Sequence, residues 1–419
     1  MHAARRFACV VTLAVGVAAA AQSAAFAAAG SLDPTFGTAG TVITPVGSGD
    51  ATIQGMALQS DGKIVVAGYA WDGTSDDFAV ARYTTAGVLD PTFGTGGVTL
   101  TDHAGNPDRA QAVALQADGK IVAAGFSGDD FAVARYTTAG VLDPTFGTGG
   151  MVVTNVGGEA EATALAIQPN GSIVVVGWAE LRGQWNFIVT RYTTAGVLDT
   201  TFHKSGQVSV DFGSNDYAMG VAIQPDGKIV VAGASGDAGT QIAVARLRST
   251  GGLDKAFGGG TGKVITTYSG GLASWADAVA LQPDGKIVVA GFVYDGTHYR
   301  FAVVRYTTAG ALDTTWGGNG KVVTNLGVGE DAAHAVALQS DGKIVVAGGG
   351  GDDFGVVRYT TAGALDTTFG GGNGYVETDL GASDQAETEA IQPDGNIVLA
   401  GFSGDYTRLN FALARYTGS

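Results

Sequence analysis

Short apolar runs alternate with polar turns along the chain, and this pattern predicts β-strands rather than helices. The first full unit contains four such runs, at residues 41–44, 54–59, 63–67 and 78–84. The run Ile64-Val65-Val66-Ala67 is apolar throughout, as expected of a strand that is covered on both faces. The preceding Ser60-Asp61-Gly62 supplies the glycine that a tight hairpin favours.

Three signatures repeat with a period of 52 to 59 residues. Leu-Asp-x-Thr-Phe, with small variations, begins at Leu32, Leu89, Leu142, Leu198, Leu253, Leu312 and Leu365. Gln-x-Asp-Gly-Lys-Ile-Val and its variants begin at Gln59, Gln116, Gln168, Gln224, Gln282, Gln339 and Gln392. Arg-Tyr-Thr begins at Arg82, Arg135, Arg191, Arg305, Arg358 and Arg415, and Arg246 begins a variant. Seven units of four strands predict an all-β fold, a seven-bladed β-propeller of four-stranded antiparallel blades.

The two ends of the repeat array indicate how the ring closes. A spare strand at 41–44 precedes the first complete hairpin, and the chain stops at Arg415–Ser419, just after a third strand. We therefore expect the N-terminal strand to complete the last blade, which also removes exposed sheet edges. Residues 30–419 are predicted to form a single propeller domain.

These repeats resemble the delta-60 repeat family, bacterial repeats of similar length. The matching segments are Leu-Asp-x-Thr-Phe-Gly, Gln-x-Asp-Gly-Lys-Ile-Val and Phe-x-x-x-Arg-Tyr, and they span about 32–419. The resemblance implies a propeller that is secreted or exposed on the bacterial surface. It implies no established activity and supplies no catalytic residues.

The N-terminal segment 1–29 has the pattern of a secretory signal peptide. Arg5 and Arg6 precede an apolar stretch from residue 7 to 21, and small residues near 25–29 offer a cleavage site. That apolar stretch is shorter than the roughly 20 residues of a membrane-spanning helix. The only cysteine, Cys9, lies within it, so the exported protein contains no disulfide. We expect a secreted or cell-surface protein without a membrane span.

The composition excludes several classes of partner. The chain of 419 residues has a formal net charge of −16, with 45% hydrophobic and only 15% charged residues. A disordered acidic protein would contain far fewer apolar residues. Nucleic acids and anionic membranes both require positive surface, so neither is expected to be a partner.

The repeat signatures separate scaffold from variable surface. We expect each Arg-Tyr-Thr arginine to pair with an acid or a turn carbonyl of its blade, because the planar guanidinium suits a fixed partner. The turns of the Gln-x-Asp-Gly and Thr-Thr-Ala-Gly segments are nearly constant and share one face. The connections between the second and third strands, and between blades, vary and share the opposite face, which we call the variable face. Most of the excess acids fall in these connections, which predicts an acidic variable face suited to binding.

Acids recur just before the predicted innermost strands and are candidates for a cation site. They are Asp50, Asp108, Glu159, Asp216, Asp331 and Asp384, and Ser274 interrupts the series. We select Asp108, Asp216, Asp331 and Asp384 as metal candidates, because carboxylates that converge at the channel mouth favour calcium. The alternative is that these acids cap turns and remain hydrated. No cofactor is otherwise required.

Residues that break the repeat symmetry are the remaining candidates for binding. The aromatic ones, expected in loops, are Trp71, Trp178, Trp185, Trp275, Tyr217, Tyr294, Tyr299 and Tyr406. Such aromatics beside carboxylates suit sugar rings or a protein partner, and they also serve to cover the ends of blades. His298 and His334, from neighbouring repeats, are further candidates for binding or for acid–base chemistry, without a recognised metal-ligand spacing.

Two hypotheses of function follow. The first is a secreted binding module, expected to be monomeric, whose acidic variable face recognises a glycan or a surface protein. The second is an extracellular hydrolase or lyase that uses acids with His298 or His334 at the channel mouth, although a propeller fold alone does not imply activity. A purely structural role in the envelope is a third interpretation.

Overall fold

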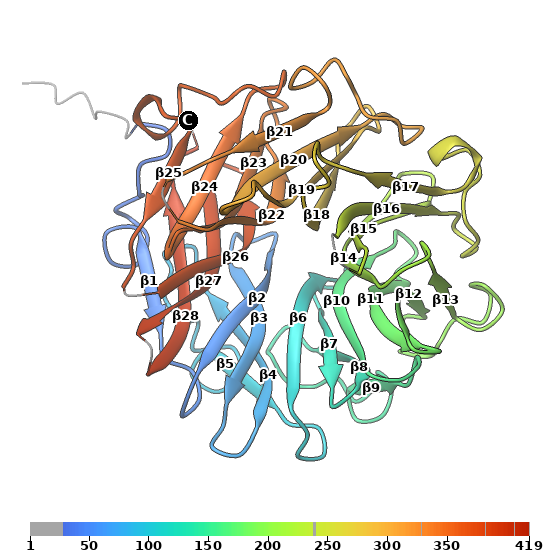
Figure 1. Cartoon of the computed structure of the whole chain (residues 1–419). Helices are drawn as coiled ribbons and strands as arrows, with labels where there is room; N and C mark the ends of the chain where they lie inside the picture. Colours follow the sequence, from blue (N-terminus) through green and yellow to red (C-terminus); the bar gives the residue numbers. More distant parts are fainter. Residues whose placement is uncertain (1–27, 238–239, 328, 382, 406, 419) are drawn as a thin grey trace, which may run out of the picture.

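The computed structural model describes residues 28–419 except 238–239, 328, 382, 406 and 419. It contains 28 strands in seven four-stranded sheets, arranged as the blades of a ring (Figure 1). The predicted seven-bladed β-propeller is therefore confirmed. The predicted signal segment 1–29 falls almost entirely outside the described residues. In the described part of the chain, no helix is long and apolar enough to cross a membrane; its two 3₁₀ turns are Gly258–Gly260 and Gly370–Gly372.

Each blade runs outward from the ring axis in chain order. The first blade consists of β2 (Ala51–Leu58), β3 (Ile64–Trp71), β4 (Asp76–Tyr83) and β5 (Val98–Thr101). The second and third consist of β6 (Asp108–Leu115), β7 (Ile121–Ser127), β8 (Asp130–Tyr136) and β9 (Met151–Thr154), then β10 (Ala160–Ile167), β11 (Ile173–Leu181), β12 (Gln184–Tyr192) and β13 (Gln207–Val210). The fourth consists of β14 (Asp216–Ile223), β15 (Ile229–Ser235), β16 (Gln241–Leu247) and β17 (Lys263–Thr266).

The remaining blades follow the same order, and the last one takes its outer strand from the start of the chain. The fifth consists of β18 (Ser274–Leu281), β19 (Ile287–Tyr294), β20 (Tyr299–Tyr306) and β21 (Lys321–Thr324), and the sixth of β22 (Asp331–Leu338), β23 (Ile344–Gly350), β24 (Asp353–Tyr359) and β25 (Tyr375–Thr378). The seventh consists of β26 (Ser383–Ile391), β27 (Ile397–Asp405), β28 (Arg408–Tyr416) and β1 (Thr41–Thr44). Thr41 pairs with Ala414 and Thr44 with Phe411, so the expected closure by the N-terminal strand is confirmed (Figure 1).

The hydrophobic core lies between the blades rather than at the centre. Seven clusters of buried residues fill the seven junctions between neighbouring blades. Ile64, Val65, Val66 and Ala67 in β3 are fully buried, as the apolar run predicts. The innermost strands contact their neighbours in sequence around the axis, and β26 contacts β2. This arrangement makes the ring rigid and places the ends of its inner strands around a central opening.

The signature arginines join neighbouring blades, as expected of scaffold residues. Each donates from Nε to the aspartate of Leu-Asp-x-Thr-Phe in its own blade, in the pairs Arg82–Asp90, Arg135–Asp143, Arg191–Asp199, Arg246–Asp254, Arg305–Asp313, Arg358–Asp366 and Arg415–Asp33. Arg82 also donates from Nη1 to the carbonyl of Thr138 in the next blade, at 2.6 Å. Its guanidinium lies 4.8 Å from the centre of the Phe93 ring. The paired arginine and the stacked phenylalanine therefore explain why the signatures recur together.

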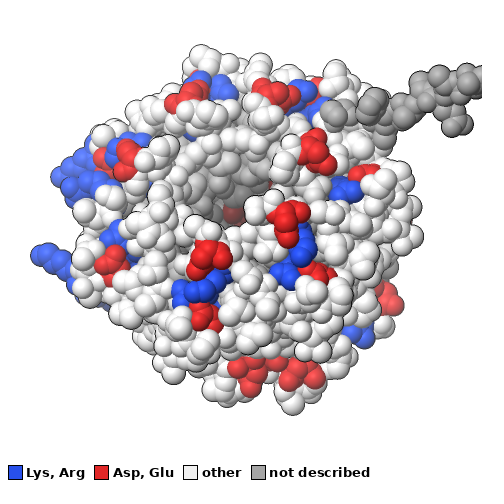
Figure 2. Space-filling view, turned by 180° about the vertical axis from the view of Figure 1, so that it is seen from behind, with Lys and Arg blue, Asp and Glu red and all other residues white. Residues whose placement is uncertain are grey.

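Pairs of lysine and aspartate in the constant turns are partly exposed to solvent. Figure 2 shows one face of the ring, on which acidic and basic surfaces lie next to each other around a central hollow. The constant turns provide pairs of this kind, such as Lys63 Nζ at 3.1 Å from Asp90 and 3.5 Å from Asp61. The scaffold therefore neutralises its own charge.

The inner and second strands extend further toward the variable face than the sequence pattern predicts. The run 54–59 becomes Ala51–Leu58, and the run 63–67 becomes Ile64–Trp71. The added residues pair in register, for example Thr52 with Tyr69. Polar and aromatic side chains at these strand ends interrupt the apolar pattern without ending the ladder, because backbone hydrogen bonds do not depend on side-chain polarity.

Candidate functional site

Six of the eight aromatic candidates lie in one continuous group, which we call the aromatic arc. The arc consists of Trp178, Trp185, Tyr217, Trp275, Phe292, Tyr294 and Tyr299 from the third, fourth and fifth blades. Neighbouring ring centres are 4.9 to 6.4 Å apart. Trp185, Tyr217, Trp275 and Phe292 stack in succession, with interplanar angles of 28°, 28° and 5°. Phe292 was not predicted, because it follows a repeat signature directly.

Equivalent strand positions bring these rings together. Tyr217 and Trp275 are the second residues of the inner strands β14 and β18. Trp178 and Phe292 follow the glycine of the second strand, and Trp275 pairs directly with Phe292. The aromatics were expected in loops, which is wrong for the members of the arc: all lie within strands. A rigid ladder therefore fixes their backbone positions, and their side chains remain partly exposed.

A hollow of about 380 Å³ lies beside the arc, between the second and third blades. Its lining includes Arg109, Phe126, Asp129, Glu159, Glu161 and Trp178, so Trp178 belongs to both the hollow and the arc. Gln111 Nε2 donates to Glu161 Oε1 at 2.9 Å, and burial raises the pKa of Glu161 above its usual value. The hollow therefore combines two aromatic rings with three carboxylates and one guanidinium.

Arg109 is held in place from the neighbouring blade. Its Nη2 lies 2.7 Å from Asp76 Oδ2, and its Nε donates to the same oxygen at 2.8 Å. Its guanidinium also lies 4.4 Å from the centre of the Tyr69 ring. These contacts fix the orientation of a partly exposed guanidinium at the edge of the hollow.

Trp71 lies apart from the arc, whereas His298 directly precedes Tyr299, a member of the arc. Trp71 ends β3 in the first blade, is 40% exposed and takes part in no ring–ring contact within the described residues. His298 lies in the turn before β20, where its backbone N–H donates to Asp295 Oδ1 at 2.9 Å. Tyr406 falls outside the described residues. The structure thus separates Trp71 from the group that contains Trp178 and Trp275.

Every inner strand contains a β-bulge, a feature that the sequence reasoning missed. The bulged residues are Gln54, Gln111, Thr163, Met219, Asp277, His334 and Glu387. Bulges commonly redirect a side chain next to a functional site. Here three successive blades place an acid, a histidine and an acid at the same position.

His334 is enclosed by charged and polar groups from both neighbouring blades. Its Nδ1 lies 2.9 Å from Asp277 Oδ2, and its Nε2 lies 2.7 Å from the side-chain amide group of Gln385. Burial would lower the pKa of His334, but the carboxylates of Glu387 and Asp277 outweigh it and raise the pKa to about 9. His334 is therefore protonated at neutral pH, and the structure does not pair it with His298.

The four carboxylates chosen as metal candidates lie at separate junctions between blades. Asp108, Asp216 and Asp331 begin inner strands, and Asp384 is the second residue of β26. Each accepts a backbone N–H from the preceding connection, from His103, Phe212, Leu326 and Leu380 respectively. Burial raises the pKa of all four. They cap turns, as the alternative interpretation held, but they are buried rather than hydrated.

Two of these carboxylates meet acids that were not predicted. The groups are Asp77 with Asp102 and Asp108, and Asp353 with Asp379 and Asp384. Burial and the neighbouring acids Asp72, Asp102 and Asp108 raise the pKa of Asp77 to about 6. The signal was present in the repeats, because Asp77 and Asp353 both precede the phenylalanine of a third strand.

Comparisons with known proteins identify the repeats but no activity. Six segments, residues 59–93, 116–146, 168–202, 224–257, 282–315 and 339–369, match the family described as a domain of unknown function (DUF5122) beta-propeller. The delta-60 name itself is not tested by this match. No curated protein matches the sequence.

Solved structures of similar fold include two lyases. Virginiamycin B lyase from Staphylococcus aureus superposes with a TM-score of 0.50 at 11% identity, over 89% of this chain and 98% of the lyase. A streptogramin B lyase gives 0.51 at 11% identity, over 90% of this chain and 97% of that one. At this identity the similarity demonstrates a shared fold.

Proposed function

We propose that the protein is an exported carbohydrate-binding module, whose binding surface is the aromatic arc together with the adjoining hollow. The observation that carries the proposal is the continuous run of partly exposed rings from Trp178 to Tyr299. Aromatic rings offer flat apolar faces on which the apolar faces of sugar rings can stack. The strand ladder holds the rings before any ligand arrives, which lowers the entropic cost of binding.

The polar groups of the hollow favour a glycan over a protein partner. Asp129, Glu159 and Glu161 line it together with Arg109. Acidic residues are depleted from the centres of protein–protein interfaces, whereas carboxylates and a fixed guanidinium suit the hydroxyl groups of a sugar. A larger hollow of about 980 Å³ near Leu100 and Val141 has no aromatic residue in its lining and offers no comparable combination.

Substitution of arc residues should test the proposal. Trp178→Ala, Tyr217→Ala and Trp275→Ala are each expected to weaken binding to an oligosaccharide selected on a glycan array, by about 1–3 kcal/mol as measured by calorimetry. Trp71→Ala is the matched control, because Trp71 is another partly exposed tryptophan at a strand end outside the arc. Circular dichroism verifies that every variant remains folded.

Two results would contradict the proposal. One is oligosaccharide binding that survives all three arc substitutions but is lost in Trp71→Ala. The other is an array without any glycan bound by the folded protein, which would remove carbohydrate as the ligand class.

One observation favours the second hypothesis, an extracellular hydrolase or lyase. Asp277, His334 and Glu387 adjoin within the inner strands, where a protonated imidazole is a proton donor. Both ring nitrogens already have polar partners, however, which is typical of a structural network rather than of a free acid or base. An activity abolished by His334→Gln, in a protein that remains folded, would support the enzyme; carbohydrate binding without turnover would support the module.

A further inference from the structure

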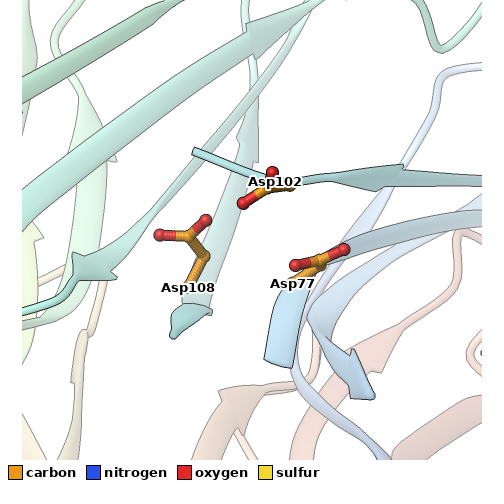
Figure 3. Close-up of side chains that lie close together, drawn as sticks. All are labelled: Asp77, Asp102 and Asp108. Carbon is orange, nitrogen blue, oxygen red and sulfur yellow. The ribbon is translucent and has the colours of Figure 1, made fainter. Parts of the chain in front are cut away.

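The seven junctions between blades repeat one constellation of three positions. These are the residue before the phenylalanine of the third strand (isoleucine in the fourth blade), the residue after the fourth strand, and the residue three positions before the bulge of the next inner strand. Between the first and second blades they are Asp77, Asp102 and Asp108. Figure 3 shows the three carboxylates turned toward a common space, and one oxygen of each lies within 4.8 Å of the others. Two oxygens on opposite sides of a calcium ion, at about 2.4 Å each, are separated by about the same distance.

The burial of Asp108 provides a second, independent indication. The residue is 0% exposed, and while its Oδ2 accepts the N–H of His103 at 2.5 Å, its Oδ1 has no hydrogen-bond partner. A buried acceptor without a partner costs about 1–3 kcal/mol, and more if it is charged. An ion between the three carboxylates would offset the charge of this buried side chain.

A comparison with the other junctions distinguishes this one. Between the fifth and sixth blades, Arg300 takes the position of Asp77, and its Nη1 lies 3.2 Å from Asp331 Oδ2. At this junction the three equivalent positions contain one acid, Asp331, and the arginine supplies a positive charge beside it. Within the described residues, no lysine or arginine lies within ion-pair distance of Asp77, Asp102 or Asp108. Unpartnered Oδ1 atoms also occur at Asp216 and Asp331, so the three converging carboxylates are the distinguishing feature.

The same triad occurs once more, between the sixth and seventh blades. Asp353, Asp379 and Asp384 take the equivalent positions, and one oxygen of each again lies within 4.8 Å of the others. Asp384 is 2% exposed, and its Oδ1 also has no hydrogen-bond partner. Both triads combine the same convergence with the same unpartnered oxygen.

We propose that the protein binds two calcium ions, one at Asp77–Asp102–Asp108 and one at Asp353–Asp379–Asp384. Carboxylate oxygens are hard ligands, and calcium accepts six to eight of them in irregular geometry. Magnesium requires a nearly ideal octahedron at shorter distances, which three carboxylates fixed on three separate chain segments do not readily form. Asp102 and Asp379 are exposed, so water completes the coordination from the solvent side.

Calorimetry of chelator-treated protein with calcium chloride tests the proposal. We expect two ions per chain in the wild type, one in Asp102→Asn, one in Asp379→Asn and none in the double variant over the same concentration range, because each substitution should weaken its site by about 10- to 100-fold. Both aspartates are exposed, and asparagine retains the Oδ1 that accepts Gly105 N–H or Gly381 N–H. The variants should therefore fold.

Asp211→Asn provides the matched control. Asp211 follows a fourth strand and is exposed, and its Oδ1 accepts Gly213 N–H as the Oδ1 of Asp102 accepts Gly105 N–H. Its junction, however, contains Asn186 at the position of Asp77. This variant should still bind two ions. The proposal is overturned if the wild type binds no calcium, if magnesium displaces calcium at equal concentration, or if Asp211→Asn loses an ion while Asp102→Asn and Asp379→Asn keep both.

Discussion

The pair formed by Arg415 and Asp33 closes the ring between the two ends of the chain. Arg415 Nε donates to Asp33 Oδ2 at 2.9 Å, its Nη1 donates to the carbonyl of Thr85 in the first blade at 2.6 Å, and its guanidinium stacks on Phe36 at 4.7 Å. The side chains of Arg415 and Asp33 are only 9% and 12% exposed. Arg415→Met would retain most of the apolar stem but leave the buried carboxylate without a cation.

The structure suggests the size of the effect. Removing one partner of a buried ion pair costs about 3–5 kcal/mol. No lysine lies within ion-pair distance of Asp33 in the described residues, because Asn396 stands at the position that Lys63 holds in the first blade. Asp90, by contrast, would keep Lys63 at 3.1 Å after Arg82→Met. We expect Arg415→Met to cost about 3–5 kcal/mol and the matched Arg82→Met distinctly less.

Urea unfolding followed by circular dichroism measures the difference. With a slope of about 3 kcal/mol per molar urea, the midpoint of Arg415→Met should fall by about 1–1.7 M. Hydrogen exchange should show lost protection in β1 and β28 for Arg415→Met only. A larger loss of stability in Arg82→Met, or unchanged protection of β1, would refute the role of Arg415 in closing the ring.

Three further predictions concern pH and packing. Burial tends to raise the pKa of Asp366, but hydrogen bonds from Thr368 and Lys343 and the charge of Arg358 lower it to about 2. The contribution of Asp366 to stability is therefore complete above about pH 3.8 and is lost as the pH falls toward 2. Acid unfolding of Asp366→Asn should lack this loss of stability. The raised pKa of His334, about 9, means that its contribution is complete below about pH 6.5 and is lost as the pH rises through 9. The stability of His334→Gln, followed by thermal melts between pH 6 and 10, should therefore depend less on pH than that of the wild type; an equal dependence would contradict the ion network. A Cβ at Gly348 would overlap the carbonyl oxygen of Ala332, whereas the atom nearest to a Cβ at Gly349 lies 3.6 Å away. In denaturant unfolding, Gly348→Ala should therefore lose about 1–3 kcal/mol of stability and Gly349→Ala almost none.

The architecture could be predicted because it depends on features that repeat. The seven arginines and aspartates, the turn glycines and the spare strand at 41–44 each have one function in all blades or at the closure. The ends of the strands were harder to predict. Residues such as Thr52 and Trp71 carry no apolar periodicity, and the ladder there is held by backbone hydrogen bonds.

The candidate sites depend on contacts between blades, which a linear sequence does not display. Trp178 and Tyr217 are separated by 39 residues, and their proximity depends on which strand positions face each other across the junction. The bulge that redirects His334 toward Asp277 has no residue signature, because the bulged position is filled by glutamine, threonine or methionine in other blades. The sequence does not distinguish Asp77 and Asp102 from ordinary turn acids, because their proximity to Asp108 depends on the packing of neighbouring blades.

The proposed calcium site and the proposed sugar site share two strands, which leads to a final prediction. Asp76 and Arg109, the ion pair at the edge of the hollow, directly adjoin Asp77 and Asp108 in β4 and β6. An ion that orders these strand ends also fixes the pair. Asp102→Asn should therefore weaken oligosaccharide binding, and coupling between sites is typically about 5- to 150-fold. Asp379→Asn is the control, because its triad lies between the sixth and seventh blades, away from the arc. Equal sugar affinity in both variants, with calcium loss verified in each, would show that the two sites act independently.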